Sequence, residues 1–377
     1  MLIGVVAETD PLETRVAASP DTVKKFIALG AAFAVQHGAG TGAGVSDAEY
    51  ESAGARMASA ADVLSGADVL LKVRRPSGVE LTQIKRGAVV VAMMDPYGHV
   101  PAIEAMAKAG VDAFAMELLP RITRAQVMDV LSSQANLAGY RAVIDATSEY
   151  GRALPMMMTP AGTVPAAKVF IMGVGVAGLQ AIATARRLGA VVTATDVRPA
   201  TKEQVESLGA KFVAVEDDEF KQAETAGGYA KEMSDAYKAK QATLVAGHVA
   251  KQDVVITTAL IPGRPAPRLV TADMVGAMKP GSVLVDLAVE RGGNVEGARA
   301  GETVTTAGGA KIVGSSSVTR LGGAASALYA RNLYAFCEPM FDKATKAFKP
   351  DLDDEILKAT LVASGGAIVH PRLKPPA

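Results

Sequence analysis

A glycine motif between an apolar run and an Ala-rich segment constrains the fold more than any other feature. Residues 168–196 read KVFIMGVGVAGLQAIATARRLGAVVTATD, in which Gly173, Gly175 and Gly178 give the pattern G-x-G-x-x-G after an expected strand. The first glycine allows a tight turn, the second lets a pyrophosphate approach the backbone, and the third lets helix and strand pack closely. The following helix offers free N–H groups and the positive end of its dipole. The motif predicts a strand, a turn and a helix that bind a dinucleotide.

An acidic residue follows at the distance that such a unit requires. Asp196 ends the next expected strand, where a carboxylate can accept hydrogen bonds from the hydroxyls of the adenosine ribose. Its charge would repel a 2′-phosphate, which favours NAD over NADP, although Arg198 lies close enough to weaken that argument. A second glycine run, Gly38–Gly44, fits the pattern in neither register, and we expect it to be a loop.

Short Val-, Ile- and Ala-rich runs alternate with amphipathic segments of helical length along the whole chain. This alternation predicts parallel sheets covered by helices. In the first half we expect strands at Leu2–Ala7, Phe33–Gln36, Val69–Val73, Ala88–Met93 and Asp112–Met116, with helices from Ser19 and at Asp47–Gly54, Ser59–Ser65, Leu81–Lys85 and Val100–Ala109. In the second half we expect strands at Lys168–Gly173, Val191–Asp196, Lys211–Val215, Asp253–Thr257, Ser282–Leu287 and Lys311–Val313.

The segments between these halves predict the domain organisation. Apolar residues at three- and four-residue spacing from Arg124 to about Arg152 predict a long helix, followed by a Pro-rich linker at Leu154–Pro165. The polar stretch Glu216–Lys240 is expected to be a mobile loop. The predicted fold class is α/β, with two doubly wound, parallel-sheet, Rossmann-like domains joined by the long helix. We expect residues 1–135 to form the first domain, completed by 325–377, and residues 136–324 to form the second.

Composition excludes several classes of protein. The 39 Lys and Arg residues balance 39 Asp and Glu residues, so the sequence does not indicate the basic surface of a nucleic-acid binder. With one cysteine, Cys337, and four scattered His residues, we expect neither a disulfide framework nor a metal site. No charge-free run is apolar enough to span a bilayer, so we expect no direct membrane insertion. Acids among the first ten residues argue against a secretory signal, and we expect a soluble, intracellular chain.

Several long segments resemble one known family. They include MELLPRITRAQVMDVLSSQANLAGYRAVIDA, TDVRPATKEQVESLGAKF, ETAGGYAKEMSDAYKAKQ and GSVLVDLAVERGGNVE. These segments are similar to the NAD(H)-binding component of proton-translocating nicotinamide nucleotide transhydrogenase. The resemblance covers essentially the whole chain and is strongest from Met116 to Asn294. It implies hydride transfer from NADH, bound here, to NADP⁺ held on an NADP(H)-binding partner component. A membrane-spanning component would couple that exchange to proton translocation.

The resemblance also implies a set of site residues. Arg121, Gln126, Asp129 and Ser132 match the family's loop that holds the nicotinamide end, with Gln126 expected between the two nicotinamides. Tyr229 matches the tyrosine of a mobile loop that closes over the nucleotide. The rest of the NAD site would be lined by Val176, Asp196, Val197, Arg198, Gly228, Gln241 and Leu260. This places the NAD site in the second domain and the interdomain cleft.

Scarcity of His fits the implied reaction. A hydride that passes between two nicotinamides needs no proton at the reacting carbon, so the chain's work would be positioning and exclusion of water. By the same resemblance, we expect a homodimer that is cytoplasmic and peripheral on the inner membrane through its partner subunits.

Two alternatives remain open. Alanine dehydrogenases share the expected fold, and Arg15 and Lys72 match their substrate-holding Arg and Lys. However, Met93-Met94 stands where that family's His follows its strand, Glu290 replaces the expected Asp, and His99 is displaced. The second alternative is a non-catalytic NAD-binding scaffold, which would keep the fingerprint and lose the nicotinamide loop. The segment Ser315–Arg320 is shorter than the family's loop, and we assign it no function.

Overall fold

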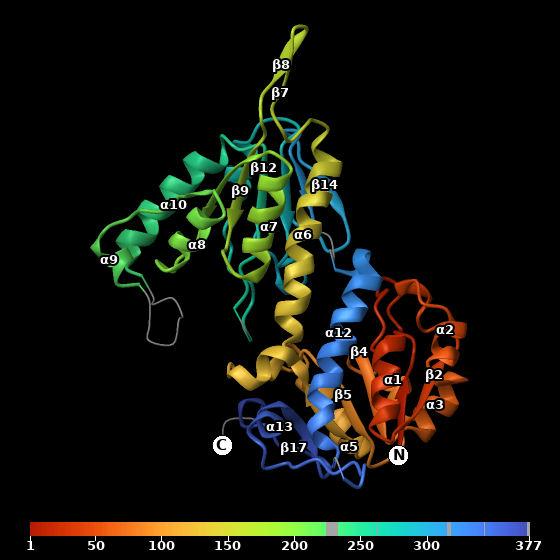
Figure 1. Ribbon diagram of the computed structural model, residues 1–377. Coiled ribbons are helices and arrows are strands. Elements are labelled where there is room, and N and C mark those ends of the chain that lie inside the picture. Colours follow the sequence, from red (N-terminus) through yellow and green to blue (C-terminus); the bar gives the residue numbers. More distant parts are fainter. Residues whose placement is uncertain (224–232, 262, 315–317, 343, 375–377) are drawn as a thin grey trace. The chain divides into compact units, whose positions relative to one another are not determined.

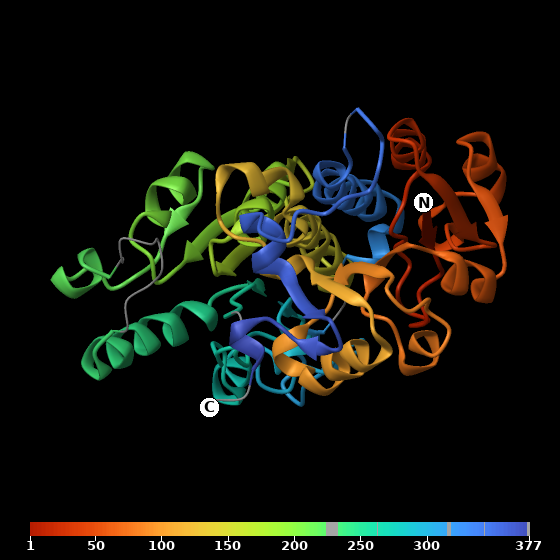
Figure 2. The same ribbon diagram turned by 90° about the horizontal axis from the view of Figure 1, so that it is seen from below.

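The computed structural model describes residues 1–223, 233–261, 263–314, 318–342 and 344–374. The chain divides into two compact units, one formed by Met1–Gln134 with Thr319–Ala377 and the other by Ala135–Val318. Each unit is an α/β domain built on a mostly parallel sheet, which confirms the predicted fold class (Figures 1 and 2). No helix among the described residues combines the length and the apolar character that crossing a bilayer requires.

The first unit contains an eight-stranded sheet in the order β17-β16-β6-β5-β4-β1-β2-β3. Strands β1 to β6 run parallel, whereas β16 is antiparallel to β6 and to β17. The strands are β1 (Leu2–Val5), β2 (Ala32–Gln36), β3 (Arg56–Ala58), β4 (Val69–Arg74), β5 (Val89–Met93), β6 (Asp112–Ala115), β16 (Leu361–Ser364) and β17 (Ala367–Ile368).

Both faces of this sheet are buried, as continuous apolar runs in parallel strands predict. Along β4, Val69 and Leu71 join the core on one face and Leu70 joins the core on the other. Helices α1 and α12 pack on the same face, where Phe26 meets Tyr334 edge-on with ring centroids 5.1 Å apart. The helices are α1 (Pro20–Ala28), α2 (Asp47–Ser52), α3 (Ala60–Gly66), α4 (Gly78–Leu81), α5 (Val100–Ala109), α12 (Gly322–Cys337) and α13 (Glu355–Thr360).

The second unit contains a seven-stranded sheet in the order β11-β10-β9-β12-β13-β15-β14. The chain moves outward from β9 through β10 to β11 and then returns to the other side of β9 with β12. At such a reversal, the carboxyl ends of the strands leave a crevice in which ligands bind. The strands are β9 (Lys168–Met172), β10 (Val191–Thr195), β11 (Lys211–Phe212), β12 (Val254–Thr257), β13 (Val283–Asp286), β14 (Thr303–Thr305) and β15 (Lys311–Val313). The helices are α7 (Val176–Arg187), α8 (Thr201–Ser207), α9 (Asp218–Lys221), α10 (Asp235–Val249) and α11 (Ala272–Gly276).

The long linking helix begins later than predicted. Residues Thr123–Met128 form a 3₁₀ turn, Asp129 leaves the helical region with ψ of 92°, and α6 then runs over Val130–Tyr150. The carboxylate of Asp129 accepts hydrogen bonds from the backbone N–H of Ser132 at 2.9 Å and from its hydroxyl at 2.6 Å. A short acidic side chain therefore competes with the backbone and caps a new helix, which the apolar spacing alone did not indicate.

Three other predictions differ from the structure. The expected linker at Leu154–Pro165 contains an antiparallel hairpin, β7 (Met157–Thr159) with β8 (Gly162–Val164). The helix expected at Leu81–Lys85 is instead α4, because Ser77 and Glu80 form a capping box that starts it earlier. Within the stretch expected to be a mobile loop, α9 and the start of α10 are helical, and residues 224–232 lie outside the described residues.

The glycine run Gly38–Gly44 is a tightly packed loop with a 3₁₀ turn at Thr41–Ala43, in line with the prediction of a loop. A Cβ at Gly42 would lie 2.9 Å from the Thr14 carbonyl oxygen, and one at Gly322 would lie 2.6 Å from the Gly42 carbonyl oxygen. These glycines therefore let the start of α12 approach the loop.

A close approach of two helices in the second unit gives a test of the packing. A Cβ at Gly139 of α6 would overlap the carbonyl oxygen of Ala177 in α7. We expect Gly139→Ala to lower the free energy of unfolding by about 1–3 kcal/mol, because backbone atoms cannot give way cheaply. The control Gly247→Ala lies on an exposed part of α10 with open space around it and should stabilise by about 0.4–1 kcal/mol. Urea unfolding followed by circular dichroism measures both, and equal effects would contradict the packing described.

Candidate functional site

The predicted strand, turn and helix around the glycine motif are present in the second unit. Strand β9 ends at Met172, and α7 begins at Val176. Gly173 has φ of +100°, a conformation that side chains disfavour, and a Cβ there would lie 2.6 Å from the Thr258 hydroxyl oxygen. A Cβ at Gly178 would overlap the carbonyl oxygen of Gly173. The first and third glycines are therefore required for the turn and for the close packing of α7.

The second glycine leaves the start of α7 open. Gly175 is the N-cap of this helix and provides no side-chain cap, while a Cβ built there meets nothing within 4 Å. The first N–H groups of a helix have no partner within the helix, and the positive end of the helix dipole lies beside them. Unobstructed space above uncapped N–H groups suits a pyrophosphate. This turn therefore fits the phosphates of a dinucleotide.

Asp196 ties the glycine turn to the neighbouring strand. Its carboxylate follows β10 directly and accepts a hydrogen bond from the Val174 N–H at 2.8 Å. Arg198 donates three further hydrogen bonds to it, from the backbone N–H and Nε at 2.9 Å and from Nη2 at 3.1 Å. These bonds use most of the acceptor capacity of a carboxylate. A further donor can bind this carboxylate by replacing one of the Arg198 bonds.

The other predicted residues of this unit lie after strands of the same sheet. Gln241 of α10 accepts from the Val215 N–H at 2.9 Å and donates to the Thr195 hydroxyl at 3.3 Å, so it joins the last residue of β10 to the segment that follows β11. Exposed side chains complete the set, Val197 after β10 and Leu260 after β12. Gly228 and Tyr229 lie outside the described residues.

Asn294 holds the loop after β12 by hydrogen bonds, a role that no motif in the sequence predicts. Its amide accepts from the Ala259 N–H at 3.0 Å and donates to the Ala259 and Pro267 carbonyl oxygens at 2.9 and 2.8 Å. It therefore fixes the loop after β12 that carries Leu260. A lone Asn after two glycines has no spacing that would reveal this role.

In the first unit, the predicted nicotinamide loop has one side packed on the buried core and the other side exposed. Ala125 and Met128 belong to the buried core, whereas Arg121 and Gln126 are exposed. Asp129 and Ser132 are joined by the two hydrogen bonds that start α6. An exposed amide on an anchored 3₁₀ turn can meet a ligand without large rearrangement.

The residues that match alanine dehydrogenase are buried in ion pairs. Arg15 pairs with Glu13 at 2.7 Å, and Lys72 pairs with Glu80 at 2.8 Å and with Glu8 at 3.4 Å. Burial raises the pKa of Glu8, although Lys72 opposes this. Both cations thus already have carboxylate partners from the chain itself.

At the positions compared with the His and the Asp of alanine dehydrogenases, this chain has Met93-Met94 and Glu290. Met94 is buried after β5, and its N–H donates to Glu117 at 3.0 Å. Burial raises the pKa of that carboxyl group. His99 stands at the start of α5 with its ring 3.1 Å from Asp95, and Glu290 lies in a 3₁₀ turn at Val289–Arg291.

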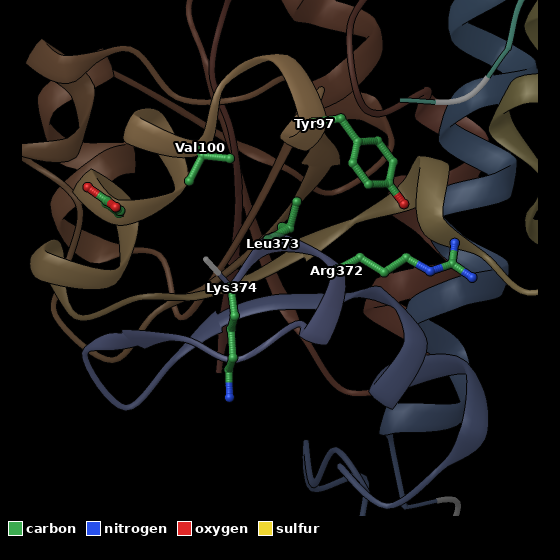
Figure 3. Close-up of a pocket in the computed structure, with 6 residues that line it drawn as sticks. Tyr97, Val100, Arg372, Leu373 and Lys374 are labelled. Carbon is green, nitrogen blue, oxygen red and sulfur yellow. The ribbon is translucent and has the colours of Figure 1, made fainter. Parts of the chain in front are cut away.

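A hollow of about 330 Å³ on the first unit lies among residues distinct from all those predicted to contact a nucleotide (Figure 3). It is lined by Tyr97, Val100, Glu104, Arg372, Leu373 and Lys374. Among the described side chains, no group of three or more His, Cys, Asp or Glu residues is arranged to hold a metal ion.

Comparisons with known proteins agree on one family. The N-terminal domain model of "Alanine dehydrogenase/PNT" matches residues 4–138, and the C-terminal domain model matches residues 142–371. An NAD(P) transhydrogenase alpha-subunit chain of Rhodospirillum rubrum is 55% identical over 99% of both chains. A crystal structure of transhydrogenase from Sinorhizobium meliloti is 60% identical, with a TM-score of 0.89, and covers 98% of this chain and 100% of that one. The alanine dehydrogenase of Mycobacterium tuberculosis is 31% identical over 79% of this chain and 75% of its own length.

Removal of the Asp196 carboxylate tests the dinucleotide turn. Asp196→Ala leaves the Val174 N–H without its acceptor and releases Arg198, so we expect NADH binding to weaken about tenfold or more, the worth of one hydrogen bond to a charged group. Glu206→Ala removes an exposed carboxylate from α8 of the same unit and should leave affinity unchanged. Isothermal titration measures both, and wild-type affinity in Asp196→Ala would remove this residue from the site.

Proposed function

Because the chain belongs to the family of NAD(P) transhydrogenase alpha subunits, we propose that it binds NADH and NAD⁺ and passes hydride from NADH to NADP⁺ on a partner component. The observation that carries this proposal is the anchored loop with exposed Gln126, in a chain that also has the open glycine turn. A scaffold without activity would have no use for such a loop.

We propose separate tasks for the two units. The pyrophosphate binds at the glycine turn and the start of α7, and the adenosine ribose binds at the segment that follows β10. The loop before α6 holds the nicotinamide end. The residues in this proposal are Gly173, Gly175, Val176 and Gly178 for the pyrophosphate, Asp196, Val197 and Arg198 for the ribose, Gly228, Tyr229, Gln241 and Leu260 around them, and Arg121, Gln126, Asp129 and Ser132 for the nicotinamide.

The proposed reaction requires little acid–base chemistry from the protein. The nicotinamide of NADH supplies the hydride from its C4 atom, and no substrate oxygen gains or loses a proton. The amide of Gln126 can donate and accept hydrogen bonds at once, so it can orient carboxamide and ribose groups. Asp129 holds Ser132 through two hydrogen bonds and so presents its hydroxyl in a fixed direction. The contribution of these residues is orientation, which governs the rate when two reacting atoms must meet.

The partners follow from the same proposal. NADP(H) is held by a second component, and a membrane-spanning component couples hydride transfer to proton translocation. The chain is then peripheral on the cytoplasmic side of the inner membrane and is held there by these subunits.

We also propose that the chain is a homodimer, and the β7–β8 hairpin is the surface that supports this. Met157 and Met158 of β7 have exposed fractions of 47% and 72%, and the hairpin stands out from the rest of the second unit in Figure 1. An isolated two-stranded hairpin is marginally stable in water, and exposed apolar side chains of this kind mark interaction sites. A second copy of the chain can cover the hairpin, because methionine side chains adapt to irregular surfaces.

Gln126→Asn tests the proposed reaction. Shortening this side chain by one methylene should slow hydride transfer by about 10- to 100-fold, because the amide no longer reaches the same position. NADH affinity should remain close to the wild type, since most contacts lie elsewhere. The assay supplies NADH as the hydride donor, an NADP(H)-binding transhydrogenase component loaded with NADP⁺, and an NAD⁺ analogue as the final hydride acceptor. The reduced analogue absorbs at a wavelength of its own, so its formation gives the rate. Gln83→Asn, an exposed amide elsewhere in the first unit, is the matched control.

The outcomes of this assay separate the alternatives. An unchanged rate in Gln126→Asn would remove this residue from the site. Tight NADH binding with no exchange in the wild type would favour a scaffold. Alanine-dependent reduction of NAD⁺ would favour an amino-acid dehydrogenase.

Polar substitutions in the hairpin test the dimer. In the Met157→Ser/Met158→Ser variant, the loss of apolar contact area should convert a wild-type dimer into a monomer. The control variant Val79→Ser/Leu352→Ser changes two exposed apolar residues of the first unit and should remain dimeric. Light scattering after gel filtration gives the masses. A monomeric wild type, or a hairpin variant that remains dimeric, would contradict the proposal.

A further inference from the structure

Asn332 of α12 bridges the turn that carries Gln126 and the first turn of α6. Its Nδ2 donates a hydrogen bond to the carbonyl oxygen of Val127 at 2.8 Å. Its Oδ1 accepts a hydrogen bond from the hydroxyl of Ser133 at 2.7 Å. Asn332 itself is buried, with an exposed fraction of 9%. One side chain thus spans the break in the helix at Asp129.

We infer that Asn332 is a positioning residue for hydride transfer, an inference that rests on the function proposed above. The side chain of Val127 is 65% exposed while its carbonyl group faces Asn332. The bond to this carbonyl therefore fixes the peptide group between Val127 and Met128, one residue beyond Gln126. The turn is also held by its buried apolar residues, by the ion pair of Arg124 with Asp354 at 2.7 Å and by backbone hydrogen bonds. Asn332 adds a hydrogen bond from α12 to the residue after Gln126, which restricts the direction of the Gln126 side chain more narrowly than these contacts do.

The helix that carries Asn332, α12, is firmly packed in the first unit. Tyr329, one turn earlier on α12, is fully buried, and its hydroxyl donates to the Lys72 carbonyl oxygen at 2.9 Å. Leu333 and Phe336 of the same helix also lie in the core. A side chain on such a helix can transmit a fixed position to the loop, as the support of a reacting group requires.

A second attachment holds the other end of the bridge. Gln134 of α6 donates to the Ala325 carbonyl oxygen of α12 at 3.1 Å and accepts from Arg15 at 3.0 Å. Arg15 is in turn held by Glu13 through hydrogen bonds of 2.7 Å. The start of α6 is therefore bound to α12 at two points, and Asn332 is the one that also reaches the loop.

An amide is required at position 332 because it must donate and accept at the same time. Leucine has a similar size and can do neither, while aspartate keeps the acceptor for Ser133 and turns a carboxylate toward the Val127 carbonyl oxygen. A buried site does not supply water to replace the lost bonds. The loop would then sample several positions of Gln126, and a displacement near 1 Å is enough to slow a positioned reaction.

The test compares Asn332→Leu with Ser133→Ala in the exchange assay described above. We expect the rate at saturating NADH to fall about tenfold or more in Asn332→Leu, and less in Ser133→Ala, which removes one bond only. The dissociation constant of NADH should change less than about twofold, because the loop adds little to binding. Rates are divided by the folded fraction from circular dichroism. If Asn332→Leu does not fold, Ser133→Ala alone must show the fall in rate at unchanged NADH affinity.

A double-mutant cycle distinguishes positioning from general stability. If Asn332 acts through Gln126, Asn332→Leu should slow the Gln126→Ala enzyme less than about twofold. A full rate in Asn332→Leu, or the same fold-loss with and without Gln126, would overturn the inference. Absence of exchange in the wild type would instead refute the proposed function, so the two failures are distinguishable.

Discussion

The approach of three backbone segments at the start of α7 is the constraint on which the second unit depends. Gly178 brings α7 against the turn after β9, and Gly139 brings α6 against the first residues of α7. Neither contact leaves room for a Cβ, so α7 begins close to the sheet with its N–H groups uncovered. Asp196 completes this arrangement through the Val174 N–H. The same close packing that orders the fold therefore creates the place where a pyrophosphate can bind.

The first unit has a different basis for order. It buries charged groups that neutralise one another, with Glu13 beside Arg15 and with Lys72 of β4 between Glu8 and Glu80. Burial alone would raise the pKa of Glu13, but the hydrogen bond and charge of Arg15 and the charge of Arg74 hold that pKa below its usual value. Removing one member of such a set is costly because the remaining charge stays buried. In this chain, these groups contribute to structure and to the support of α6 through Gln134.

The sequence predicted what depends on local pattern. The glycine spacing at Gly173–Gly178 and the apolar runs indicated the fold class and the dinucleotide turn, since close packing and burial restrict residue type at each of those positions. Features set by single side-chain hydrogen bonds were not predictable in this way. Asp129 ends one turn and starts α6, and Ser77 starts α4 earlier than its apolar pattern suggests. The hairpin at Met157–Val164 was missed because three prolines, Pro155, Pro160 and Pro165, resemble those of a linker. The roles of Asn294 and Asn332 depend on contacts far along the chain, which one sequence does not reveal.

We propose that NADH binds over the glycine turn of the second unit and that the loop before α6 holds its nicotinamide. A crystal structure of the chain with NADH tests this most directly. We expect the pyrophosphate at the N–H groups that begin α7, a ribose hydroxyl on Asp196 in place of an Arg198 bond, and the nicotinamide beside Gln126. A dinucleotide seated away from this turn, or a nicotinamide with no contact to the loop, would contradict it.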